Sequence, residues 1–151
     1  MKLLSLLILP ALLFGGTPRE YQIASVKAMN SRDVKAYLAG YADLTPAKRK
    51  AAFFSHVSLW KNYPKVHTLF LDCSVIMEPG GKEAHVLGAI LTTHGPKPQN
   101  VWVFEETLIL RDGKWLSSSI GARDFIDMTK TSWPGLIKYL LSKHGLDIEH
   151  I

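Results

Sequence analysis

The sequence predicts an α+β domain: helices first, then a four-stranded antiparallel sheet, then one more helix. Three observations support this. Apolar residues recur at helical spacing up to Trp60. From Lys65 the period changes to two, over long runs joined by tight turns. A helical apolar stripe returns near the C-terminus. We therefore expect N-terminal helices packed on a strongly curved four-stranded antiparallel sheet, with a C-terminal helix added.

Length and composition define the broad class. The chain has 151 residues, the size of one domain, and its 47% apolar and 21% charged residues exclude disorder of the whole chain. Its single cysteine excludes a disulfide framework and a multi-thiolate zinc site. The net charge is +5, and Lys48, Arg49 and Lys50 form the only basic cluster, which we interpret as a solvated helix face. No nucleic-acid partner is expected, because such binding needs clustered Lys and Arg with interleaved aromatic residues.

Residues 1–16 have the layout of a secretory signal peptide. Lys2 gives a positive start, residues 3–14 are apolar apart from Ser5 and Pro10, and two glycines follow. The apolar run is too short to span the roughly 30 Å hydrocarbon core of a bilayer. We expect cleavage near residues 15–18 and a secreted or periplasmic mature chain without a transmembrane segment. A buried N-terminal helix or a membrane anchor is the alternative.

Three helices are expected next. The first covers residues 19–29. Ser31 caps the second, whose apolar stripe has helical spacing and comprises Val34, Tyr37, Leu38 and Tyr41. Thr45 caps the third, with Pro46 at its first position. This helix runs to about Trp60, and its expected buried side consists of Phe53, Phe54, Val57 and Trp60.

Four strands follow, at residues 65–77, 83–94, 99–111 and 114–120. Residues 79–82 and the pair Asp112-Gly113 provide hairpin turns. In the first strand, alternation places Cys73 on one face with His67 and Leu71. Thr68, Phe70 and Asp72 fall on the other face.

The last helix is expected over residues 129–144, with Pro134 in its first turn and Gly145 at its C-terminal end. Its apolar stripe has helical spacing and comprises Trp133, Leu136, Ile137, Leu140 and Leu141. Such a stripe does not stay exposed on a soluble monomer. We expect it to fold back on its own domain, with a homodimer contact as the alternative.

Two segments resemble the nuclear transport factor 2-like, or SnoaL-like, superfamily. Residues 28–43 (AMNSRDVKAYLAGYAD) are similar to its helix signature, and residues 107–115 (TLILRDGKW) are similar to its last hairpin. The resemblance implies a cystatin-like cone with a pocket between helices and sheet. It divides the chain into a signal peptide (1–16), the superfamily domain (17–122) and a C-terminal helical extension (123–151).

The resemblance does not imply one activity. Members include isomerases, cyclases, dehydratases, transport factors and accessory domains, some of them attached to peptidoglycan-active enzymes. Where the enzymes carry a catalytic acid on a short strand, this chain has Leu44-Thr45-Pro46, which starts a helix. No catalytic residue can therefore be transferred from the superfamily.

We expect the concave side of the sheet to hold the site. Its candidate lining residues are aromatic or titratable, namely Tyr37, Tyr41, Trp60, His67, Cys73, Trp102, Glu106 and Arg123. Glu106 shares a strand face with Trp102 and Leu108, which predicts a mostly buried carboxyl with a raised pKa. Its neighbour Glu105 then points to the opposite face. The histidines show no metal-site spacing, and neither a metal nor a cofactor is expected.

These observations favour a secreted or periplasmic, non-catalytic domain that binds a small molecule or a protein. One alternative is an isomerase, dehydratase or hydrolase that uses the pocket carboxylate. Another is an envelope interaction protein that binds through the C-terminal helix. A second acid or a histidine beside Glu106 would favour an enzyme, and an apolar or closed pocket would favour binding.

Overall fold

A computed structural model describes residues 16–149. The predicted signal peptide therefore lies almost entirely outside the described residues. The elements in chain order are α2 (Pro18–Asn30), α3 (Val34–Leu38), α4 (Pro46–Asn62), β1 (Val66–Met77), β2 (Glu83–His94), β3 (Lys97–Arg111), β4 (Lys114–Asp127), α5 (Trp133–Tyr139) and the π-helical turn η1 (Leu140–His144). The predicted fold class is confirmed.

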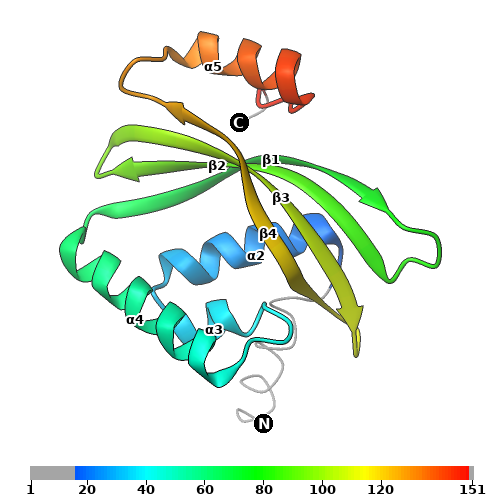
Figure 1. The fold of residues 1–151 in the computed structure, drawn as a ribbon. Helices are drawn as coiled ribbons and strands as arrows, with labels where there is room; N and C mark the ends of the chain where they lie inside the picture. The colour runs from blue at the N-terminus through cyan, green and yellow to red at the C-terminus, as the bar shows by residue number, and fades with distance from the viewer. Residues whose placement is uncertain (1–15, 150–151) are drawn as a thin grey trace, which may run out of the picture.

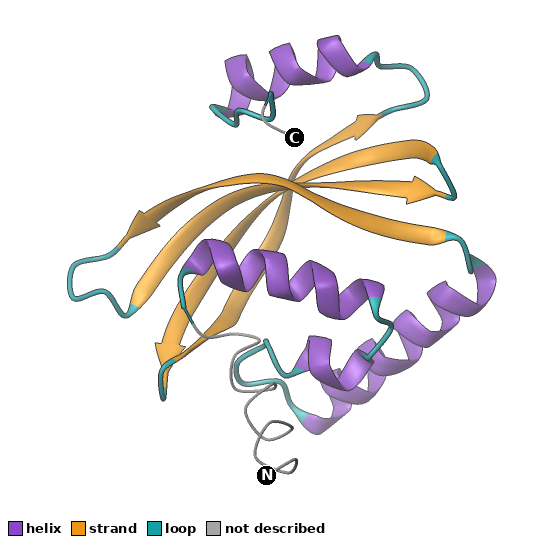
Figure 2. Cartoon of the chain, turned by 180° about the vertical axis from the view of Figure 1, so that it is seen from behind, coloured by secondary structure: helices purple, strands orange, loops and turns teal. Residues whose placement is uncertain are grey.

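The sheet has the simple order β1-β2-β3-β4, and each neighbouring pair is antiparallel. Helices α2, α3 and α4 lie on one side of this strongly twisted sheet, and α5 lies on the other side (Figures 1 and 2). We call the face toward α2 the inner face and the face under α5 the outer face. Among the described residues, no helix is long and apolar enough to cross a membrane.

The helix starts follow from local hydrogen bonds. Thr17 and Glu20 form a capping box at the start of α2. Thr45 caps α4 as predicted, with Pro46 in the first turn. The cap of α3 is Asp33 and not Ser31, because the Ser31 hydroxyl donates to the Ala28 carbonyl at the end of α2.

The predicted division of β1 into two faces is wrong. A bulge between Phe70 and Asp72 shifts the register against β2. Phe70 therefore packs in the same cluster as Cys73, whereas Leu71 joins the cluster under the C-terminal helix. One extra residue in a strand moves every later side chain to the opposite face of the sheet. The local sequence gives no sign of this bulge.

β4 is longer than predicted and runs to Asp127 instead of Ile120. Two register shifts against β3 lie opposite Thr107/Leu108 and Val103/Phe104. They interrupt the alternation of side chains between the two faces, so the pattern does not predict the second half of the strand. The expected boundary at residues 122/123 consequently falls inside a strand.

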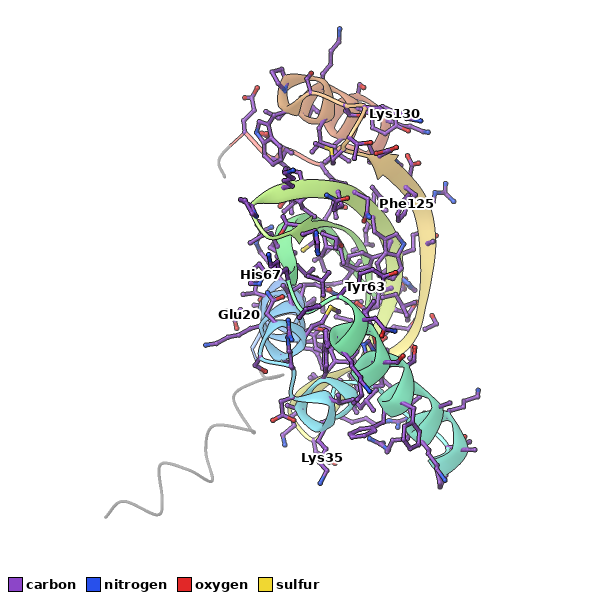
Figure 3. The ribbon with its side chains drawn as sticks, turned by 90° about the vertical axis from the view of Figure 1, so that its left-hand side faces the viewer. Glu20, Lys35, Tyr63, His67, Phe125 and Lys130 are labelled. Atoms are coloured by element: carbon purple, nitrogen blue, oxygen red, sulfur yellow. The ribbon has the colours of Figure 1, made fainter. Side chains whose placement is uncertain are left out.

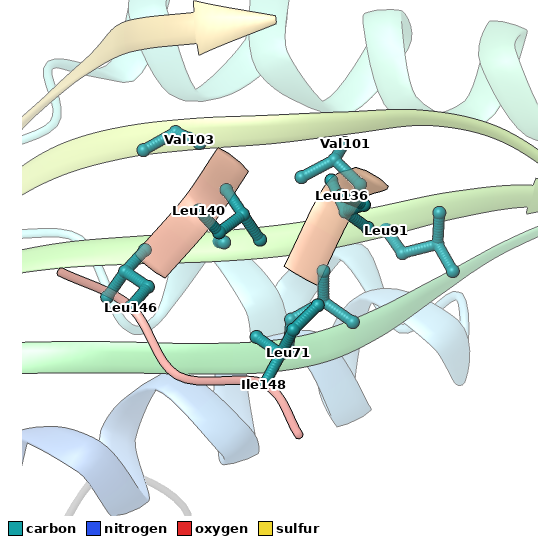
Figure 4. Packing of buried hydrophobic residues seen from close by; sticks show 9 residues of the cluster. Leu71, Leu91, Val101, Val103, Leu136, Leu140, Leu146 and Ile148 are labelled. Carbon is teal, nitrogen blue, oxygen red and sulfur yellow. The ribbon is translucent and has the colours of Figure 1, made fainter. Parts of the chain in front are cut away.

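The C-terminal helix packs on its own domain, as expected. α5 and η1 cover one part of the outer face and bury an aliphatic cluster there, in which every residue is at most 4% exposed. Figure 4 shows this packing. The cluster is aliphatic throughout and comprises Leu71, Ala89, Leu91, Val101, Val103, Leu136, Leu140, Leu146 and Ile148. The two ends of the predicted stripe stay outside, with Trp133 37% and Leu141 50% exposed.

α4 does not bury the side that was predicted. Of its four expected core residues, Trp60 is 8% exposed, and Phe53, Phe54 and Val57 all count as exposed. The helix faces the domain through a narrow row one turn apart, formed by Ala52, His56 and Trp60. A narrow contact row leaves the rest of an apolar helix uncovered.

Candidate functional site

The inner face buries one carboxylate at the centre of β3. Glu106 is 5% exposed, and the Nε2 of Gln22 on α2 donates to its Oε2 at 2.5 Å. Its neighbour Glu105 points to the other face and is exposed. The predicted strand phase and the predicted burial of Glu106 are therefore confirmed.

Burial raises the pKa of Glu106. The Gln22 amide and the nearby Ser117 hydroxyl favour the charged form, but they only partly offset the cost of removing it from water. Ser117 is itself 2% exposed, and its Oγ has no partner within hydrogen-bonding geometry among the described residues. The site is thus a carboxyl that keeps its proton to higher pH than an exposed one.

Three buried tyrosines lie near this carboxyl. The Tyr21 hydroxyl donates to the Gly40 carbonyl at 2.9 Å, and the hydroxyls of Tyr37 and Tyr41 share a hydrogen bond of 2.7 Å. Burial raises the pKa of all three, and the nearby Glu106 raises each further. The tyrosines therefore remain neutral hydrogen-bonding groups at physiological pH.

Helix α4 adds an aromatic layer behind Tyr37. The His56 ring centroid lies 5.0 Å from that of Tyr37 and 5.6 Å from that of Trp60. Burial lowers the pKa of His56, so its ring is held in the neutral form. His56 therefore packs as an aromatic ring against Tyr37 and Trp60.

The edge of the inner face is apolar and open. Trp102 pairs with Phe125 and Glu106 pairs with Ile120, so these side chains share one face of the sheet. Ile120 is 39% and Phe125 66% exposed, and Phe125 lies on β4 in Figure 3. The Trp102 ring lies 5.5 Å from that of the buried Phe104. We call Trp102, Ile120 and Phe125 the apolar shelf.

The structure brings six of the eight predicted site residues to the inner side. Five of them are Tyr37, Tyr41, Trp60, Glu106 and, on the shelf, Trp102. Cys73 is also buried on this face, but in the cluster around Tyr21, where burial raises the pKa of its thiol.

The remaining two lie elsewhere. His67 is exposed on the edge strand β1, with its Nε2 3.5 Å from the Nδ2 of Asn30. Arg123 occupies the bulge of β4, and its Nε lies 3.8 Å from the Oε1 of Glu105, away from Glu106. Sequence reasoning missed Gln22, Tyr21 and Ser117. The packing of α2 on the sheet brings Gln22 and Tyr21 toward Glu106, and the pairing of β4 with β3 brings Ser117 there.

A second polar cluster joins β4 to the C-terminal elements. Asp124 accepts hydrogen bonds from the Tyr139 hydroxyl at 2.6 Å and from the Nε2 of His144 at 2.8 Å. The Lys143 ammonium lies 3.4 Å from the same carboxylate. The Tyr139 bond, followed by the His144 bond, holds the pKa of Asp124 well below its usual range. This cluster fixes the C-terminal segment on the sheet.

Other hollows lie outside the inner face. One of about 460 Å³ opens on the sheet among Ser74, Ile76, His85, Leu87, Glu105 and Thr107, with Val86 and Glu106 also contributing. Within residues 16–149, no three His, Cys, Asp or Glu side chains come together as metal ligands.

Comparison with known proteins identifies the fold and no closer relationship. No family model and no curated protein matches the sequence. A protein of unknown function with a cystatin-like fold from Nostoc punctiforme superimposes with a TM-score of 0.54 at 11% identity, over 70% of this chain and 84% of that one. An NTF-2-like protein of unknown function from Shewanella oneidensis gives 0.50 at 18% identity, over 66% of this chain and 90% of that one.

A longer protein contains a similar domain. Bd1075 from Bdellovibrio bacteriovorus gives a TM-score of 0.56 at 9% identity, over 74% of this chain. This chain spans only 39% of Bd1075. The helices, the four-stranded antiparallel sheet and these neighbours together show a cone-like α+β fold of the cystatin-like and NTF-2-like kind.

Proposed function

We propose that this chain is a non-catalytic binding domain that takes an apolar group, from a small molecule or a partner protein, on the apolar shelf. One observation supports the proposal: the side chains exposed on the inner face are apolar, whereas the polar groups of this face are buried. Ile120 and Phe125 are exposed, whereas Glu106, Ser117 and Gln22 are at most 5% exposed. An exposed aromatic and aliphatic surface recognises apolar groups.

The burial of Glu106 supports binding over catalysis. A general acid or base must reach the proton that it transfers. The Glu106 carboxyl is covered and already accepts the Gln22 amide bond. Glu106 then serves to accept the hydrogen bond of the buried Gln22 amide between α2 and the sheet.

A neutral fluorescent dye tests the shelf. N-phenyl-1-naphthylamine is expected to bind the native chain and to brighten as it leaves water. Phe125→Ser should weaken this binding about tenfold, because it removes the most exposed aromatic side chain of the shelf. Ile76→Ser is the matched control, since Ile76 is 68% exposed elsewhere on the sheet. Equal loss in both variants would contradict the assignment of the shelf.

We also propose that the chain is exported and that residues 1–16 are its signal peptide. The charged start, short apolar run and glycine pair support this. Protein isolated from the native host should begin between about residues 15 and 18. Recovery of Met1 or Lys2 by N-terminal sequencing would overturn the localisation.

An enzyme that uses Glu106 is the second candidate. The observation in its favour is a carboxyl whose pKa is raised by burial and which lies near three buried tyrosines. In a screen of isomerase, dehydratase and hydrolase substrates, any turnover should then vanish in Glu106→Gln. Glu105→Gln is the control. Turnover that survives Glu106→Gln would exclude this candidate.

A third hypothesis, an envelope protein that binds through the C-terminal helix, has less support than the other two. Leu136 and Leu140, the centre of the apolar stripe, are fully buried against the sheet. They are not available to a partner.

A further inference from the structure

The surface of α4 is positively charged, and the sequence around this helix has no acidic residue to compensate. Residues 44–71 contain neither Asp nor Glu. They contain the basic residues Lys48, Arg49, Lys50, Lys61 and Lys65. The whole chain has 18 Lys and Arg against 13 Asp and Glu, so this segment accounts for much of the basic excess.

The same surface exposes large apolar side chains. Phe53 is 38%, Phe54 59% and Val57 41% exposed. Lys50 precedes Phe54 by one turn and Lys61 follows Val57 by one turn, so all five lie along one side of the helix. We call Lys50, Phe53, Phe54, Val57 and Lys61 the α4 patch. Ala52, His56 and Trp60 form the separate row that anchors α4 to the domain.

A groove extends the patch toward α3. It has a volume of about 540 Å³, and its lining combines three cations with three apolar side chains. These are Lys35, Arg49, Lys50, Leu38, Pro46 and Phe53. Lys50 and Phe53 belong to both the groove and the α4 patch, so the two form one continuous surface.

We propose that the α4 patch docks on an anionic lipid bilayer. A helix that presents Phe and Val between Lys and Arg side chains matches the boundary between charged headgroups and acyl chains. The lysine stems can lie along apolar surface while their ammonium groups reach the lipid phosphates. α4 has 17 residues and is exposed along its length, so it can lie flat on such a surface. This inference does not depend on the apolar shelf or on any ligand there.

A fluorescent reporter on α4 tests the depth of docking. In the full chain, Phe54→Cys is labelled with the environment-sensitive dye NBD, since Cys73 is only 8% exposed. Vesicles containing phosphatidylglycerol should shift its emission to the blue, and vesicles of phosphatidylcholine alone should not. The control is NBD at Lys130→Cys, whose lysine side chain is 83% exposed beyond β4 and should stay in water.

Charge reversal tests the electrostatic part. Lys50→Glu should weaken binding to the anionic vesicles by about tenfold or more, because it removes one attractive charge and adds a repulsive one. Lys130→Glu produces the same net charge and should leave binding within about twofold. All variants share residues 1–15, so any contribution of that segment cancels in the comparison.

Three results would overturn the proposal. The dye at position 54 could remain in water with anionic vesicles. Lys50→Glu and Lys130→Glu could weaken binding equally, which would indicate net charge alone. The dye could shift without vesicles as the protein concentration rises, which would indicate that a second copy of the chain, and not a bilayer, covers the patch.

Discussion

The two faces of the sheet are covered by different chemistry. On the outer face, α5 and η1 seal an aliphatic cluster in which the buried side chains carry no polar atom. On the inner face, α2 and α3 cover aromatic rings together with a carboxyl, an amide and hydroxyls. Burial of aliphatic surface stabilises the fold directly, whereas buried polar groups are costly unless they are paired. The cluster under α5 and η1 is therefore a purely aliphatic core, and the core of the inner face combines aromatic rings with buried polar groups that need partners.

Leu140→Ala should have the largest effect, because it opens a cavity in the sealed outer cluster. Leu140 is fully buried, so we expect a loss of about 3 kcal/mol in the free energy of unfolding. Urea denaturation measures it. Leu141→Ala, in the next position and 50% exposed, should change stability by less than about 0.5 kcal/mol. Similar losses at both positions would mean that α5 and η1 are not docked as described.

Gly88→Ala tests how tightly the aromatic side is packed. A Cβ at Gly88 would lie 2.4 Å from the ring of Phe104, itself 3% exposed. We expect a cost of about 2 kcal/mol from overpacking, and Phe104→Leu should recover part of it. Gly121→Ala is the matched control, since a Cβ there meets nothing within 4 Å. A neutral Gly88→Ala would show that the ring has room to move.

Asp124→Asn tests the polar link between β4 and the C-terminal segment. Losing the charged acceptor of Tyr139 and His144 should cost about 1.5 kcal/mol at neutral pH. The folded-state pKa of Asp124 is lowered from 3.8, so this stability is present above that value and is lost as the pH falls below it. Thermal unfolding from pH 7 downward should show the gap from wild type closing. Asp112→Asn, in an exposed turn, should show no such gap.

Glu106→Gln should have the smallest effect and sharpens the contrast between the faces. A raised folded-state pKa means that the native state resists ionisation, so the cost to the wild type appears as the pH rises above 4.5. The variant should be equal to the wild type in stability, or slightly more stable, with an advantage that is larger at pH 8 than at pH 4. Glu105→Gln should show no comparable trend. A large loss in Glu106→Gln at every pH would mean that the charged carboxylate is required.

Some features of the site could be predicted because they depend on local alternation. β3 has no register shift against β2 between Glu83 and Thr92, so counting by twos correctly separated Glu106 from Glu105. The same counting failed on β1, where a bulge exchanges the faces, and the bulges in β4 concealed its extension to Asp127. Gln22 and Ser117 carried no signal, because their relation to Glu106 arises only when α2 and β4 pack around β3.

Sequence patterns alone predict the order of the elements, the helix cap at Thr45 and the antiparallel meander, because turns, caps and periodicity are properties of neighbouring residues. Two features depend on packing between distant parts of the chain: the C-terminal helix lies on the outer face, and α4 leaves Phe54 and Val57 exposed. Apolar spacing shows that a helix has a face to bury but not which surface receives it. That choice depends on the twist of the sheet and on competition among helices for its two sides, and both arise from contacts between residues distant in the chain.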